Sequence, residues 1–392
     1  MLKLRRLTAA TATASLGSAS QAARALHTTQ PAVTASIAAL ESELGTPLFA
    51  RTAQGMTLSA AGHPFIAHVE TAFAVIDTFG ATLSGNGAPL HRRISETQLQ
   101  AFLALNETGS HGGAARRLGV SQPAISRSVR DLEIVLGATL WRRTGTSGEP
   151  TSEGRALARA TGVFSREIEL AVESLREHQG RIDGVIRIGA LPLSRSDWVP
   201  DAVMATLRQF PGAHISLVDG PYSEQIAALR HGRIDMIVGA LRDEGEATAD
   251  IDQTALFDDA LSIAVRSDHP VLSHGVSPAW LAAQAWVLPA RGTPGRDRFL
   301  AYLATQGLAE PGKVVECGSL VATRALLRGS DLAAPLSRRQ IRLELERGLL
   351  ALAAMDLPGT VRPIGVTVRR GFRPTRLYTG FLDALSEGAQ QL

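Results

Sequence analysis

Residues 120–137 read VSQPAISRSVRDLEIVLG, and residues 28–45 read TTQPAVTASIAALESELG. The two stretches lie 92 positions apart, and their similarity extends outward on both sides. Residues 17–52 and 109–144 share 17 identities in 36 positions without a gap. Because chance agreement in an Ala-rich chain gives only a few identities, the first half of the chain is a duplicated unit.

Each unit has the pattern of a winged helix-turn-helix. The sequence predicts first helices at 4–15 and 96–107, second helices at 19–26 and 111–118, and third helices at 29–44 and 121–136. A Pro lies in the first turn of each third helix, where a missing N–H costs little, and a Gly ends it. LFARTAQGMTLSAAG and LWRRTGTSGEPTSEG then read as two extended arms around a Gly-containing tip, which is a wing.

A long amphipathic linker helix is expected after each wing, at 59–84 and 151–180. Apolar positions recur at alternating spacings of four and three, and they are Phe65, Val69, Ala72, Ile76, Phe79 and Leu83, matched by Leu157, Thr161, Phe164, Ile168, Ala171 and Leu175. Such a seam is typical of a helix that pairs with another helix. Two arrangements fit: an antiparallel pair within one chain, or pairing only between chains.

From residue 184 onward, short β runs alternate with helices, which predicts an α/β domain. We expect lobe I at about 184–262 and 363–392, and lobe II at about 263–362. ALSIAVR (260–266) and VRPIGVTVRR (361–370) are expected to cross between the lobes. The predicted fold is therefore α/β overall: winged helix-turn-helix units at 1–58 and 95–150 with linker helices, then a periplasmic-binding-protein-like domain at 184–392.

Ligands of such domains bind beyond the carboxyl ends of strands, against helix N-termini. Candidate effector-binding residues at these places are Ser194, Tyr222, Ser223, Arg291, Thr293 and Ser319. Their hydroxyl groups, free backbone N–H groups and one guanidinium suit an organic anion or a sugar-like molecule. The alternative is that Ser223, Thr293 and Ser319 serve only as helix N-caps.

The two units share the pattern GS...AAR.L...QPA...S...LE..LG..L..RT. This pattern resembles the helix-turn-helix sequence of the LysR-type transcriptional regulators. The resemblance covers about residues 2 to 388, and the chain departs from the family pattern by carrying two DNA-binding units instead of one. It implies a cytoplasmic, homo-oligomeric (dimeric) transcriptional regulator. The expected partners are double-stranded DNA and a small organic effector, and RNA polymerase is a further candidate.

In the family, the third helix enters the major groove and the wing touches the backbone or the minor groove. Carried over to the second unit, this implies DNA contacts by Ser121, Gln122, Pro123, Ser126, Arg127, Arg130 and, on the wing, Arg143. The chemistry agrees, because an Arg can bind guanine through two hydrogen bonds or clamp a phosphate.

The first unit is less well equipped for DNA. Ala35 and Ala38 stand where the second unit has arginines, whereas Gln30, Thr34 and Arg51 are retained. Two interpretations remain open: a degenerate copy kept for structure, or a weak, auxiliary DNA contact.

Other function classes find little support in the sequence. There is no P-loop, GxGxxG, GxSxG or HExxH motif, so we expect no enzyme activity and no cofactor. The His residues lack metal-ligand spacing, and Cys317 is the single cysteine. No run approaches the ~18 apolar residues that span a bilayer. The alternative function is a solute-binding receptor whose helix-turn-helix region acts in protein assembly.

Overall fold

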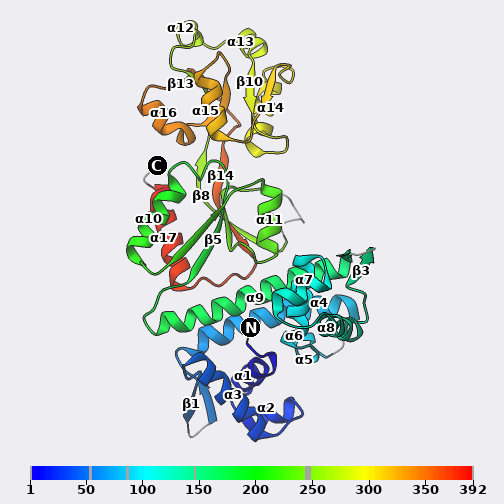
Figure 1. Ribbon diagram of the computed structural model, residues 1–392. Coiled ribbons are helices and arrows are strands. Elements are labelled where there is room, and N and C mark those ends of the chain that lie inside the picture. Colours follow the sequence, from blue (N-terminus) through cyan, green and yellow to red (C-terminus); the bar gives the residue numbers. More distant parts are fainter. Residues whose placement is uncertain (1, 53–54, 85–87, 145–146, 243–248, 391–392) are drawn as a thin grey trace.

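The computed structural model describes residues 2–52, 55–84, 88–144, 147–242 and 249–390. Two α/β lobes are stacked at one end of the molecule (Figure 1). One small helical unit lies at the opposite end, and the other projects to one side. Two long helices lie between these parts. The predicted combination of winged helices and a two-lobed α/β domain is therefore confirmed.

The two small units are winged helix-turn-helix folds, which we call the first head and the second head. The first head consists of α1 (Leu4–Leu16), α2 (Ala19–Ala25), α3 (Gln30–Leu44), β1 (Phe49–Thr52) and β2 (Gly55–Leu58). The second head consists of α6 (Glu96–Thr108), α7 (His111–Leu118), α8 (Gln122–Leu136), β3 (Trp141–Thr144) and β4 (Ser147–Pro150). In each wing the two strands pair antiparallel.

The repeat extends to individual hydrogen bonds. In the first head, Glu41 Oε1 accepts a hydrogen bond from the N–H of Leu48 at 2.7 Å. In the second head, Glu133 Oε1 accepts one from Leu140 at 2.8 Å. Both carboxylates satisfy backbone donors where the chain leaves the third helix for the wing. The duplicated sequence therefore builds the same turn twice.

The linker helices α4 (Gly62–Ser84) and α9 (Ser152–His178) pack against each other within the chain. The rings of Phe73 and Phe164 have centroids 6.3 Å apart, and His68 Nδ1 lies 2.8 Å from Glu167 Oε2. From the first of these contacts to the second, the residue number falls on α4 and rises on α9, so the two helices are antiparallel. Of the two arrangements that the seam allows, the structure contains the in-chain pair.

One hydrophobic core joins both heads to this linker pair. It contains Leu7 and Leu40 of the first head, Phe65 and Phe164 of the linkers, and Leu132 of the second head. Burying an aliphatic or aromatic side chain contributes roughly 1.5–3 kcal/mol. Both heads therefore pack against the linker pair, although the second head also has a separate apolar cluster of its own.

The connection between the two units folds back onto α4. Residues of α5 (Leu90–Arg93) dock there: the His91 ring stacks on Phe73 with centroids 4.0 Å apart, and His91 Nδ1 lies 2.7 Å from Asp77 Oδ2. Burial alone raises the pKa of Asp77, but the hydrogen bonds and charge of His91 outweigh it and hold that pKa below its usual value. The part of the connection after residue 89 is thus anchored to the linker pair.

Lobe I of the effector domain is built on a five-stranded sheet in the order β6-β5-β7-β14-β8. Its strands are β5 (Val185–Ala190), β6 (His214–Val218), β7 (Met236–Ala240), β8 (Ile251–Asp259) and β14 (Arg362–Arg369). The first three run parallel, and β14 is antiparallel to both β7 and β8. The helices of this lobe are α10 (Trp198–Gln209), α11 (Tyr222–Arg230) and α17 (Arg376–Gln390).

Lobe II has two smaller sheets. Its strands are β9 (Leu261–Arg266), β10 (Trp286–Leu288), β11 (Val314–Glu316), β12 (Ala334–Ser337) and β13 (Leu350–Leu352). The order is β12-β9-β13 in one sheet, and β10 pairs with β11 in the other. The helices are α12 (Val271–His274), α13 (Pro278–Ala283), α14 (Pro294–Thr305), α15 (Leu320–Arg328), the 3₁₀ turn η2 (Arg338–Ile341) and α16 (Arg342–Glu346).

The crossings between the lobes differ from the prediction. Residues 260–266 and 361–370 were expected to cross, but β9 belongs wholly to lobe II and β14 wholly to lobe I. The chain crosses at Ala260 and between β13 and β14 instead. The error has a physical source: β8 was not recognised as a strand, because IDQTALFDD carries three acidic residues and exposes much of its surface.

Buried charges attach lobe I to α9. The Arg166 guanidinium, whose side chain is 1% exposed, binds Asp235 Oδ1 at 2.8 Å and the Tyr378 hydroxyl at 2.6 Å. It also donates to the carbonyl oxygen of Val185 on β5 at 2.7 Å. Although burial alone lowers the pKa of Arg166, the Asp235 charge reverses the effect and raises it. These buried contacts therefore attach lobe I to α9.

Candidate nucleic-acid interface and effector cleft

The N-terminal end of α8 is the exposed tip of the second head. Ser121 is the N-cap, and its hydroxyl oxygen accepts a hydrogen bond from the N–H of Ala124 at 3.4 Å. Gln122 and Pro123 are exposed beside it. A capped and accessible helix N-terminus presents N–H groups and a positive dipole end to an anion such as a phosphate.

Two arginines extend this surface along α8. Arg127 and Arg130 are exposed, and Ser126 lies half-buried next to them. Neither guanidinium has a hydrogen bond or an ion pair with another described residue. Because an Arg on a protein surface commonly finds an acidic neighbour, two that lack one on the same helix face are available for an external partner.

The wing arginines can be placed only by their backbones. Arg51 lies in β1 opposite Met56, and Arg143 lies in β3 opposite Gly148. Their side chains lie outside the described residues.

The equivalent face of α3 carries no charge. Gln30 is exposed and Thr34 half-buried, and Ala35 and Ala38 are exposed where α8 has its arginines. Of the two acidic residues on this helix, Glu41 binds backbone N–H groups before the wing, and Glu43 is paired with Arg6 of α1 at 2.5 Å. The first head therefore has the same helix-turn-helix fold as the second, but its third helix lacks the arginines of α8.

The candidate effector residues of lobe I do not all face the same space. Ser194 is fully buried, and its hydroxyl lies within hydrogen-bond distance of the carbonyl oxygens of Leu191 and Val238. Ser223 is exposed, and Tyr222 is half-buried with a guanidinium above its ring. The Ser194 side chain therefore lies in the interior of lobe I, where it hydrogen-bonds the backbone beside β5 and in β7.

In lobe II, the candidate residues lie at the starts of helices. Thr293 donates a hydrogen bond to the carbonyl oxygen of Ala290 at 2.8 Å, one residue before α14. Ser319 caps α15. Arg291 is exposed and lies 3.5 Å from Glu310. N-capping and ligand contact are compatible for Ser319, so its cap does not decide between the two roles.

Arg242 connects the two groups of loops, and sequence reasoning missed it. Its guanidinium lies over the Tyr222 ring, 4.4 Å from the centroid, and donates to the carbonyl oxygen of Gly292 in lobe II at 2.6 Å. Arg242 follows β7, so it also stands beyond the carboxyl end of a parallel strand. Applying that rule to every strand of the sheet would have found it.

A buried ion pair lies where the chain crosses between the lobes. Arg362 of β14 binds Asp259 of β8 at 3.0 Å, and Ser337 of lobe II donates to the same carboxylate at 2.5 Å. Burial raises the pKa of Asp259 and lowers that of Arg362, in each case against the effect of the partner charge. A Cβ on Gly295, in the first turn of α14, would lie 2.7 Å from the Arg362 guanidinium. The crossing thus lies directly against the first turn of α14.

At a second place, lobe I touches η2 and the start of α16. Arg342 Nε lies 2.9 Å from Asp197 Oδ2, and the Ser196 hydroxyl donates to the carbonyl oxygen of Gln340 at 3.3 Å. Together with Arg242, these contacts fix the relative position of the lobes by a few polar interactions. Such contacts can be exchanged at low cost when the lobes move.

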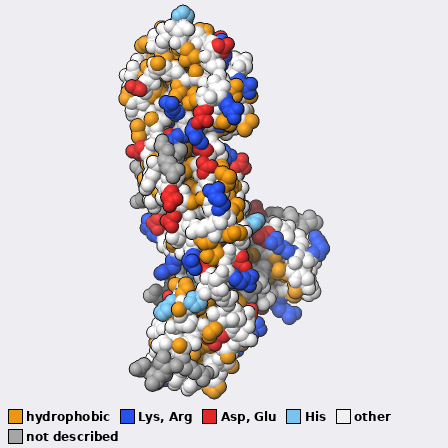
Figure 2. All heavy atoms as spheres, turned by 90° about the vertical axis from the view of Figure 1, so that its left-hand side faces the viewer, with side chains coloured by type: hydrophobic (Ala, Val, Ile, Leu, Met, Phe, Trp, Pro, Cys, Tyr) orange, Lys and Arg blue, Asp and Glu red, His pale blue; other side chains and the backbone are white. Residues whose placement is uncertain are grey.

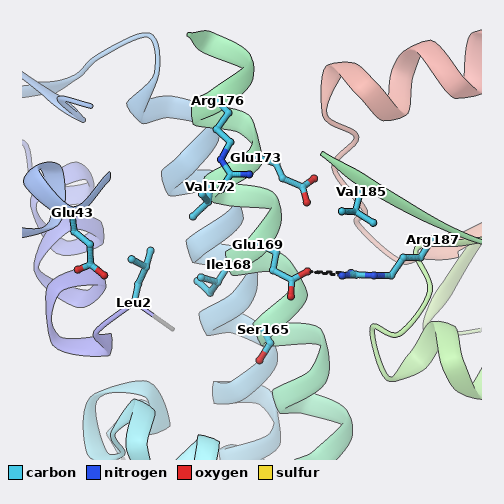
Figure 3. Close-up of a pocket in the computed structure, with 10 residues that line it drawn as sticks. All are labelled: Leu2, Glu43, Ser165, Ile168, Glu169, Val172, Glu173, Arg176, Val185 and Arg187. Atoms are coloured by element: carbon cyan, nitrogen blue, oxygen red, sulfur yellow. Dashed lines mark hydrogen bonds and ion pairs between the residues drawn. The ribbon is translucent and has the colours of Figure 1, made fainter. Parts of the chain in front are cut away.

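A separate groove of about 580 Å³ lies on α9, away from the cleft. It is lined by Leu2 and Glu43 of the first head on one side and by Val185 and Arg187 of β5 on the other (Figure 3). Glu169 and Arg187 form an ion pair across it at 3.1 Å. Its acidic and basic groups largely neutralise each other, so the groove carries no strong charge preference.

The described residues contain no group of three or more His, Cys, Asp or Glu side chains placed to hold a metal ion. None of their helices is long and apolar enough to cross a bilayer. Cys317 is half-buried, with its sulfur 3.4 Å from the carbonyl oxygen of Ser319.

Comparisons with known proteins agree with this architecture. The chain matches the LysR substrate binding domain over residues 179–390, and the bacterial regulatory helix-turn-helix of the lysR family twice, over 4–63 and 97–155. It is 34% identical over 359 residues to the HTH-type transcriptional regulator GalR of Pseudomonas putida, covering 91% of this chain and 90% of that one. PcaQ of Agrobacterium fabrum is 28% identical over 302 residues, covering 77% of this chain and 97% of that one.

Solved structures share the fold at lower identity. ArgP of Mycobacterium tuberculosis has a TM-score of 0.60 at 19% identity, covering 75% of this chain and 97% of that one. LysG of Corynebacterium glutamicum, solved with bound effector Arg, has a TM-score of 0.55 at 21% identity, with the same coverage.

Two winged heads joined to a two-lobed sensor domain define a DNA-binding transcriptional regulator that responds to a small effector. The chain belongs to the LysR family of such regulators. Its two helix-turn-helix matches establish the duplicated unit that the sequence predicted.

Proposed function

We propose that the second head reads base identity in double-stranded DNA. The observation that carries this proposal is the pair of exposed arginines, Arg127 and Arg130, without described partners on α8. Ser121, Gln122, Pro123 and Ser126 would support them at the helix N-terminus, and Arg143 would contact the backbone from the wing. The face shown in Figure 2 mixes acidic and basic side chains over the effector domain instead of forming one basic surface. This distribution favours a DNA contact confined to the heads.

The test is a footprint of the purified full-length chain on DNA from its own promoter region. We expect protection of a discrete site at physiological salt, and competition by excess non-specific DNA that leaves the footprint in place. Uniform, sequence-independent coverage would contradict base reading, because binding through phosphates alone does not select a site.

For the effector, we propose a small organic anion or sugar-like molecule bound between the lobes. Tyr222, Ser223 and Arg242 would contact it from lobe I, and Arg291, Thr293 and Ser319 from lobe II. In the structure, Arg242 already reaches Gly292 across the cleft. A carboxylate that replaced this carbonyl oxygen would form a stronger, charge-assisted hydrogen bond.

Effector binding would change the position of lobe II. Lobe I is fixed to the linker pair through Arg166 and Asp235, whereas lobe II is joined by two chain crossings and a few polar contacts. An effector that binds one lobe arrangement better shifts the population toward it. In a homo-oligomer this movement would reposition the subunits on DNA and their contacts with RNA polymerase. We further propose a cytoplasmic protein that carries out no catalysis.

Replacing Arg242 with glutamine should weaken effector binding. Losing a hydrogen bond to a charged group costs about 1.5–3 kcal/mol, which corresponds to a roughly 10- to 150-fold higher Kd. A thermal-shift screen with organic acids and sugars would first identify a ligand, and calorimetry would then measure both variants. Arg328→Gln, at an exposed position on α15, is the matched control. Equal affinity of Arg242→Gln and the wild type would remove Arg242 from the site.

A further inference from the structure

The linker pair sets the spacing of the heads within one chain. In Figure 1 the first head lies at the end where α4 begins, and the second head lies at the end where α9 begins. Gln179, just after α9, donates to the Thr46 hydroxyl of the first head at 2.5 Å. Arg93 of α5 donates to the carbonyl oxygen of Val135 in the second head. Each head is therefore anchored by the linker region of the other unit.

The two heads that are held in this way are chemically unequal. The exposed face of α8 offers two guanidinium groups, whereas Ala35 and Ala38 of α3 cannot form a hydrogen bond to a base through their side chains. The exposed cations of the first head lie elsewhere, as Lys3 and Arg5 near the start of α1 and Arg24 on α2. Cations placed off the reading helix suit phosphates, which carry no base information.

Symmetric DNA sites arise when two identical heads meet DNA, because operator palindromy mirrors the two-fold symmetry of a dimer. In this chain the paired heads belong to one polypeptide and differ at their reading positions. Within the stretch of DNA bound by one chain, the chemical reason for a palindrome is therefore absent.

We propose that one chain occupies both halves of its DNA site, and that this site is asymmetric. The second head reads bases in one half through Arg127 and Arg130. The first head binds the sugar-phosphate backbone of the other half and discriminates little between bases. This inference rests on the proposed function of α8 and adds the form of the DNA that the chain selects.

The experiment uses the full chain and the promoter fragment located by its footprint. Each base pair of the site is changed in turn, and the Kd is measured at fixed salt. We expect changes in one half to raise the Kd by about 5- to 150-fold each, the usual effect of a mismatch at a read position. Changes in the other half should raise it by less than about threefold, whereas removing that half from the duplex should weaken binding strongly.

Two variants separate this proposal from the proposed function of α8. Arg127→Ala should reduce discrimination in the strongly read half only. The double variant Ala35→Arg with Ala38→Arg should introduce discrimination in the other half. Two equally discriminating, palindromic halves would overturn asymmetry even if Arg127→Ala lowers affinity. If the double variant Arg127→Ala with Arg130→Ala changes neither affinity nor discrimination, base reading by α8 is wrong, and the proposal falls with it.

Discussion

Asp235→Ala is expected to destabilise the protein by about 3–5 kcal/mol, because it leaves the Arg166 guanidinium buried without its main partner. Asp235 is fully buried and holds both Arg166 and the Tyr378 hydroxyl. Burial makes the protonated, neutral form of Tyr378 more stable, which raises its pKa well above the usual value, so it cannot supply the missing negative charge. The variant therefore removes the only carboxylate that pairs with Arg166 from lobe I among the described residues, and leaves this buried cation with Glu169 and Glu173 of its own helix.

The measurement is the free energy of unfolding from denaturant titration of the full chain, followed by limited proteolysis between residues 178 and 185. A matched control is Asp219→Ala, which removes the partner of Arg195 at the surface, where Asp219 is 77% exposed. Exposed pairs contribute about 0–1 kcal/mol. If both variants lose the same small amount, the buried network does not hold lobe I to the linkers.

Arg127→Ala is expected to weaken DNA binding by about 1–3 kcal/mol if its guanidinium binds a guanine through two hydrogen bonds. The loss should be largest on the wild-type site and much smaller on non-specific DNA, because a base contact contributes only at the correct base. Gel-shift titrations on both DNAs at one salt concentration would measure the two affinities.

Arg208→Ala is the control for this change, since Arg208 is exposed on α10, outside the heads. It removes the same charge from the chain without touching α8. An equal loss on both DNAs would make Arg127 a phosphate contact, and an unchanged affinity would remove it from the interface.

Much of the fold could be predicted from the sequence because the repeat constrains it. Each helix, wing and linker of one unit had to agree with its copy 92 residues away, so ambiguity in one was resolved by the other. The effector domain had no such internal check. There β8 was missed, and the crossings were assigned to the neighbouring strands.

The choice between in-chain and between-chain pairing could not be made from the seam alone. Apolar residues such as Phe65 and Phe164 can pack in either arrangement. The structure adds one contact that the repeat does not duplicate. His68 of α4 binds Glu167 of α9, whereas the position of α9 that corresponds to His68 is Ala160, and the position of α4 that corresponds to Glu167 is Val75. A pair formed by two copies of α9 would leave Glu167 without a His partner, so this contact favours pairing of α4 with α9 over pairing of two copies of α9.

The candidate sites divide in a similar way. Residues on α8 were predictable because helix periodicity places Arg127 and Arg130 on one exposed face. The ends of the strands in lobe I were located correctly. Whether a side chain beyond a strand end points outward or into the protein depends on how the sheet and helices pack, which the sequence pattern does not show. Ser194 therefore turned inward, and Arg242, whose reach to Gly292 exists only in three dimensions, was overlooked.

The central claim is that one chain supplies both paired heads, and a disulfide between Thr46→Cys and Gln179→Cys tests it most directly. These side chains touch in the structure, and Cys317→Ser removes the native thiol. After oxidation, we predict that the bridged protein runs as a single chain of 41.4 kDa on a non-reducing gel, and that a mixture of the two single-Cys chains gives no bridge. Covalent dimers from both samples, with no bridge inside a chain, would contradict the claim.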